Sequence, residues 1–223
     1  MPSSSKKILL FVALLFSASL VFSHSINYAL EHAPVKDVVW FYLKLGFTHI
    51  IPSGADHILF VIGLCLLSTN IKTILWQATA FTVAHSITLA LSMKNIAMAP
   101  GALVEPVIAL SIMFVAVENM MIQKLRPWRI LLVFLFGLIH GMGFASALNE
   151  TGLPPDRFYT AVIAFNAGVE LGQIVVIAAV FALLIHPYRE RRWYRTGVVF
   201  SVSIVIALIA FYWTVERVFF NHV

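Results

Sequence analysis

Two histidines and an aspartate stand close together in the segment HIIPSGADHILF, where His49, Asp56 and His57 precede a run of apolar residues. Imidazole nitrogens and carboxylate oxygens are ligands that proteins use for divalent transition metals. Pro52 and Gly54 lie between His49 and Asp56, and we expect them to break a helix and free backbone groups there. The segment is therefore a candidate metal site, and the alternative is an interfacial loop whose polar groups face water.

Three more polar residues stand inside long apolar segments. His85 lies in FTVAHSITLAL, His140 in GLIHGMGFA and Glu170 in NAGVELGQ. An ionisable side chain inside a membrane helix is costly to bury and points to a functional site. The alternative for each is a packing residue that is hydrogen-bonded to a neighbouring helix. The full candidate set of metal ligands, which suits Ni, Co or Zn, is His49, Asp56, His57, His85, His140 and Glu170.

Two other polar residues call for a structural explanation. Glu118 and Asn119 lie near the end of an apolar segment that we expect to reach the cytoplasmic side. Hydrogen bonding to another helix accounts for such residues without a functional role. We therefore leave them out of the metal site.

The composition places these residues in a membrane. The chain of 223 residues is 61% hydrophobic and only 11% charged, whereas about a quarter of the residues in a soluble domain are charged. The basic residues behind the net charge of +5 stand in the breaks between apolar runs, so they indicate membrane orientation and not nucleic-acid binding. The single cysteine, Cys65, excludes an intramolecular disulfide and a Cys-rich metal site.

We expect an all-α, polytopic helical membrane protein with an N-terminal signal peptide. Residues 1–23 have a basic start, an apolar stretch and a small residue at the end, although an uncleaved signal anchor is the alternative. Residues 24–52 are interpreted as a periplasmic segment with an interfacial helix, and residues 53–217 as a six-helix transmembrane domain. The expected spans are Ser53–Ser68, Ile71–Ser92, Leu103–Gln123, Trp128–Leu148, Phe158–Ile185 and Gly197–Val215.

The basic residues give an orientation. They are denser in the breaks that follow the first, third and fifth spans than in the remaining segments, which predicts that both termini lie outside the cytoplasm. Cleavage after Ser23 would make His24 the first residue, and its amine and imidazole, assisted by His32, could then bind copper or nickel. The alternative is that His24 is an ordinary first residue without a metal.

The four quoted segments, in this order, resemble the HupE/UreJ family of bacterial membrane proteins, and more narrowly its second subgroup. Gly54, Asp56 and His57 match the first family signature, and His140-Gly141 is the nearest match to the second. His49 matches the leading histidine in type but not in spacing, and Glu170 stands on a later helix than the expected acid. The resemblance implies a nickel or cobalt permease in the bacterial inner membrane.

Two functions remain open at this point. The first is a secondary permease for a divalent metal ion, which would work without an ATPase motif because the chain contains no P-loop. The second is a membrane-embedded zinc hydrolase, in which three histidines and a carboxylate hold the ion and leave one position for water. The expected partners are the lipid bilayer and the metal ion, and neither the metal nor the oligomeric state follows from the residues.

Overall fold

The computed structural model describes residue 30 and residues 32–151 and 154–220. The predicted signal peptide and His24 lie outside the described residues. Within the described part of the chain the structure is helical and contains no strand, as the apolar segments predict. The main helices are α2 (Val35–Ile50), α3 (Ala55–Leu66), α4 (Ile71–Met93), α5 (Gly101–Met121), α6 (Arg129–Thr151), α7 (Phe158–Val180) and α8 (Ser201–Phe219).

Short helical segments join the long helices near α7 and α8. A single 3₁₀ turn, Pro155–Arg157, leads into α7. The π-helical segments Phe181–Ile185 and Tyr194–Phe200 extend α7 and precede α8. These additions make α7 and α8 parts of two long apolar helices, Pro155–Ile185 and Tyr194–Phe219.

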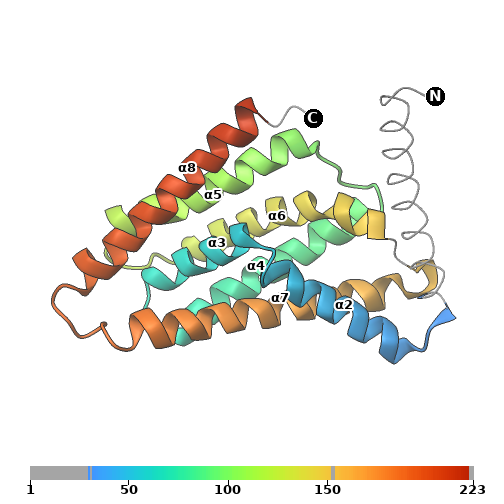
Figure 1. Cartoon of the computed structure of the whole chain (residues 1–223), viewed down its shortest axis with the longest axis horizontal. Helices are drawn as coiled ribbons and strands as arrows, with labels where there is room; N and C mark the ends of the chain where they lie inside the picture. The colour runs from blue at the N-terminus through green and yellow to red at the C-terminus, as the bar shows by residue number, and fades with distance from the viewer. Residues whose placement is uncertain (1–29, 31, 152–153, 221–223) are drawn as a thin grey trace, which may run out of the picture.

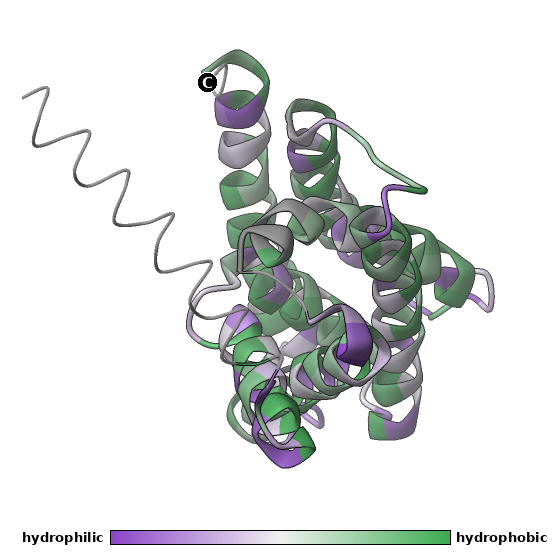
Figure 2. Ribbon diagram, turned by 90° about the vertical axis from the view of Figure 1, so that its right-hand side faces the viewer, coloured by the Kyte–Doolittle hydropathy of each residue, from purple (hydrophilic) through white to green (hydrophobic). Residues whose placement is uncertain are grey.

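Among the described residues, four helices are long and apolar enough to cross a membrane, and a fifth span results if α2 and α3 count as one broken span. The four are Ile71–Met93, Gly101–Met121, Pro155–Ile185 and Tyr194–Phe219. The apolar part of α6, Arg129–Ala145, is shorter, so the predicted total of six spans stays a prediction. Large apolar side chains are exposed along the outer faces of these helices, and Figure 2 shows hydrophobic residues over much of the bundle. Lipid is the medium that suits such a surface.

The break between α2 and α3 is where Pro52 and Gly54 predict it. Helix α2 ends at Ile50, α3 begins at Ala55, and the two helices meet at an angle of 69°. Helix α3 alone has 12 residues and is about 18 Å long, which is too short to cross about 30 Å of hydrocarbon. The predicted start of the first span at Ser53, and the interfacial position of the preceding helix, remain predictions.

The bundle is built from three closely packed helix pairs: α2 with α7, α4 with α6, and α5 with α8. Figure 1 shows these pairs lying one beside another, with α3 among them. Glycines allow two of the pairs to approach closely. A methyl group on Gly168 of α7 would overlap the Leu43 carbonyl of α2, and one on Gly141 of α6 would overlap the His85 carbonyl of α4. Small residues bring membrane helices together in this way.

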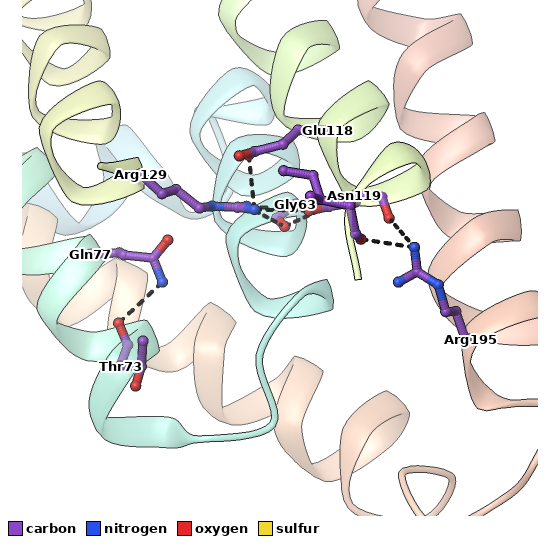
Figure 3. Close-up of polar contacts among 8 residues, drawn as sticks. Gly63, Thr73, Gln77, Glu118, Asn119, Arg129 and Arg195 are labelled. Atoms are coloured by element: carbon purple, nitrogen blue, oxygen red, sulfur yellow. Dashed lines mark hydrogen bonds and ion pairs between the residues drawn. The ribbon is translucent and has the colours of Figure 1, made fainter. Parts of the chain in front are cut away.

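A buried polar network joins α3, α5 and α6 where α5 ends (Figure 3). The Arg129 side chain is fully buried, and its Nη1 lies 2.9 Å from Oε2 of Glu118. Both terminal guanidinium nitrogens donate to Oδ1 of Asn119 at 3.2 Å. Asn119 Nδ2 donates to the Gly63 carbonyl at 2.8 Å. The expectation that Glu118 and Asn119 bond to other helices is therefore confirmed.

Candidate metal centre

The break between α2 and α3 brings two of the predicted ligands together. His49 is in the last turn of α2, and His57 is in the first turn of α3. Their ring centroids lie 4.7 Å apart, with the rings edge to face. A continuous helix would separate these residues by more than two turns, about 12 Å along the axis. The bend is therefore what turns the two histidines into neighbours.

His85 of α4 completes a group of three. One ligand nitrogen from each of His49, His57 and His85 lies within 4.8 Å of the other two. Nitrogens bound to one tetrahedral ion at about 2.0–2.1 Å stand roughly 3.4 Å apart. Side-chain shifts of about 1 Å would therefore suffice to place all three around one ion.

His140 of α6 lies next to this group. Its ring centroid is 5.3 Å from that of His57, although it is not part of the group of three. Its Nδ1 lies 2.8 Å from the Phe136 carbonyl oxygen. A carbonyl only accepts, so Nδ1 carries the hydrogen in this bond and Nε2 keeps a free lone pair.

The tautomer of His85 follows from Asn166 of α7. Asn166 Nδ2 donates to the Val162 carbonyl at 2.8 Å, which leaves its Oδ1 facing His85 Nδ1 at 3.3 Å. His85 Nδ1 therefore donates, and its Nε2 is the unprotonated nitrogen. An oxygen that holds the distal N–H of an imidazole is the usual support for a metal-binding histidine.

The four histidines share one property. The Nε2 atoms of His49, His57, His85 and His140 are buried, and none has a hydrogen-bond partner in the described part of the protein. Buried polar atoms normally find a partner, because an unsatisfied one costs free energy. Four such nitrogens in one place, two of them with an assigned lone pair, fit a site for a metal cation.

A cavity of about 550 Å³ leads to this site. His49, His57 and His140 line it on one side, and Glu105 and Arg217 line it near the start of α5 and the end of α8. The side chains of Ile108, Phe144 and Trp213 complete its apolar wall. An ion at the histidines would thus be reachable from one end of the bundle.

The two predicted carboxylate ligands make other contacts. Arg217 Nη2 donates to both oxygens of Asp56, at 3.1 and 2.9 Å, and Arg217 Nη1 donates to the Glu105 carbonyl at 3.1 Å. Asp56 therefore lines the cavity as the partner of an arginine. Glu170 accepts from Thr79 Oγ1 at 2.7 Å, and it is neither in the histidine group nor among the residues that line the cavity.

The comparison with protein families covers most of the chain. The family model HupE_UreJ_2, described as HupE / UreJ protein, matches residues 25–217. The chain belongs to the HupE/UreJ family. No curated protein and no solved structure matches it. The family and the apolar helices together make this HupE/UreJ chain a multi-pass membrane protein.

Two residues of this HupE/UreJ chain contact residues of the site although they were not among the predicted metal ligands. Asn166 shares a helix face with Glu170 at a spacing of four residues, which marks it as a polar residue facing the bundle. Nothing in the local pattern identifies it as the partner of His85, because that contact joins helices α4 and α7. Arg217 stands two residues after the last predicted span, which ends at Val215, with no local sign that it pairs with Asp56.

Replacement of Asn166 by leucine tests the support of His85. The variant keeps a side chain of similar size but removes the acceptor for Nδ1, so His85 is free to rotate and to change tautomer. We expect divalent metal affinity, measured by competition with a fluorescent chelator, to fall about tenfold to a hundredfold.

Gln173→Leu is the matched control, because Gln173 is on the same helix and accepts from Thr82 at 3.1 Å. We expect this variant to bind metal like the unmodified protein. An equal loss of affinity in both variants would show that α7 packing is responsible and would count against the support of His85 by Asn166.

Proposed function

We propose that this protein is a secondary permease for a divalent transition metal ion, nickel or cobalt, in the bacterial inner membrane. The observation that carries the proposal is the set of four buried histidine Nε2 atoms around the bend between α2 and α3, none of which has a hydrogen-bond partner among the described residues. Imidazole ligands suit nickel and its neighbours in the transition series. Discontinuous helices are a common way for transporters to build ion sites inside the membrane.

The route begins in the cavity. Asp56, Glu105 and Arg217 are its charged lining residues, so two carboxylates face one guanidinium and the balance favours a cation. A hydrated ion would enter there, exchange water for His49, His57 and His140, and reach His85 behind them. The uncharged imidazoles provide ligands without the strong charge that would hold a divalent ion permanently.

The way onward lies between α4 and α7. Two hydrogen bonds join these helices beyond His85, Thr79 to Glu170 at 2.7 Å and Thr82 to Gln173 at 3.1 Å. Glu170 Oε2 has no hydrogen-bond partner among the described residues. We assign Glu170 to a later, transient ligand role, which agrees with its place outside the histidine group. We also propose that both termini lie outside the cytoplasm, as the distribution of basic residues predicts.

A membrane-embedded zinc hydrolase is the second candidate. The observation in its favour is the size of the cavity, about 550 Å³, whereas an ion with six waters fills roughly 200 Å³ at about 30 Å³ per water. Three histidines beside such a space also resemble a catalytic zinc site with one open position.

Liposomes that contain the purified protein and an internal metal-sensitive dye distinguish the two functions. A permease gives nickel or cobalt entry that His57→Ala removes and that the exposed-histidine control His186→Ala keeps. A hydrolase gives no entry, but retains about one zinc per chain through dialysis. Absence of both entry and retained metal would reject both functions.

A further inference from the structure

A second cavity lies at the end of the bundle opposite the histidine cavity. It has a volume of about 410 Å³ and is formed by the start of α4 and by the connection between α5 and α6. Glu105 near the start of α5 lines the histidine cavity, whereas this second cavity adjoins the segment that follows the end of α5. The residues that line it are Thr73, Trp76, Gln77, Leu125, Arg126, Pro127 and Ile130.

Gln77 gives this cavity an unpartnered acceptor. The residue is only 1% exposed, and its Nε2 donates to the Thr73 carbonyl at 3.1 Å, as Figure 3 shows. The other amide atom, Oε1, has no hydrogen-bond partner in the part of the chain that the structure describes. A buried acceptor of this kind calls for a donor from outside the protein.

Arg126 gives the same cavity a positive charge. Its side chain is exposed, and the ion pairs among the described residues involve Arg129, Arg189 and Arg217 instead. A guanidinium group that has no carboxylate partner is available to a phosphate, which it binds with two parallel hydrogen bonds.

The surroundings of the cavity are those of a membrane interface. Trp76 is 67% exposed, and tryptophans favour the level of the lipid headgroups. Ile130 and Leu131 at the start of α6 are exposed apolar side chains, next to which acyl chains can lie. A lipid headgroup in the cavity would therefore leave its acyl chains beside these exposed apolar side chains.

We propose that this cavity binds the headgroup of an anionic glycerophospholipid that carries a free hydroxyl group, with phosphatidylglycerol as the simplest case. The phosphate binds Arg126, and the headgroup hydroxyl donates to Gln77 Oε1. Basic pockets between membrane helices recognise anionic lipids by the same charge pairing. The proposal is independent of metal transport, because none of these residues lines the histidine cavity.

Native mass spectrometry of the full-length protein in detergent tests the proposal with three lipids. Phosphatidylglycerol has the charge and the hydroxyl, phosphatidylmethanol has the charge alone, and phosphatidylcholine has no net charge. We expect affinity to fall in that order, by about fivefold for the loss of the hydroxyl and by about fivefold more for the loss of the net charge.

Two variants separate the contributions. Arg126→Gln should weaken phosphatidylglycerol binding about fivefold, and Gln77→Leu should make phosphatidylglycerol and phosphatidylmethanol bind equally. Arg192→Gln, which removes an exposed charge that does not line the cavity, should leave binding unchanged. The proposal is overturned if the unmodified protein binds the two anionic lipids equally, or if Arg192→Gln weakens binding as much as Arg126→Gln.

Discussion

His57→Ala lowers the affinity for nickel or cobalt by more than about a hundredfold, the upper limit for changes that only disturb the support of a ligand. His57 is in the middle of the site: its ring centroid lies 4.7, 5.8 and 5.3 Å from those of His49, His85 and His140. Its removal would take away one proposed ligand and also the side chain that lies next to each of the other three histidines. Isothermal titration calorimetry of the purified protein in detergent measures the loss.

His186→Ala is the control for this experiment, because His186 is exposed and does not line the cavity. It should keep the full affinity. His140→Ala should show a smaller loss than His57→Ala, because His140 is outside the group of three. If His57→Ala binds metal as tightly as the unmodified protein, the histidines are packing residues and the metal site is wrong.

Arg129→Met destabilises the fold by about 3–5 kcal/mol, the usual effect of removing one partner from a buried ion pair. The variant leaves the Glu118 carboxylate in the bundle without its guanidinium partner at 2.9 Å. It also removes the donors to Asn119 Oδ1, which stands at the junction of α3, α5 and α6 (Figure 3). Thermal unfolding followed by circular dichroism in detergent should show a clearly lower midpoint.

A second substitution shows whether the unpaired charge causes this loss. The double variant Glu118→Gln with Arg129→Met should recover much of the stability, because no uncompensated charge remains buried. Arg189→Met is the control, since the Arg189–Glu190 pair is exposed and 3.9 Å long, and it should leave the midpoint nearly unchanged. Equal midpoints for the Arg129 and Arg189 variants would contradict a structural role for the buried network.

The local parts of the proposed metal site could be predicted from the sequence. His49 and His57 flank Pro52 and Gly54, so the break that brings them together is encoded within the same short segment. His85 and His140 were predicted from their positions inside apolar segments. Their convergence was not derivable in the same way, because distance along a helix gives depth but not the direction in which a side chain points.

The pairs of charged side chains on different helices could not be predicted from the sequence in this way. Asp56 has a carboxylate, which is a common metal ligand, but in the structure this carboxylate accepts hydrogen bonds from Arg217 on the last helix. From its position in the sequence, Arg129 is expected to be one of the basic residues that set the orientation of the protein in the membrane. In the structure its side chain is fully buried beside Glu118. In both cases the partner lies on another helix, and helix packing selects which charged side chains meet.

The four histidines of the proposed metal site come from two of the helix pairs and from α3. His49 belongs to the α2–α7 pair, His85 and His140 belong to the α4–α6 pair, and His57 is on α3. An ion held by these histidines would join α2, α3 and the α4–α6 pair, so its affinity would depend on how these helices are placed relative to one another. A rotation of one of these helix pairs by a few degrees would move the histidine nitrogens apart, even if no side chain changed its rotamer. Release of the ion would then need neither a change of protonation nor the unfolding of any helix.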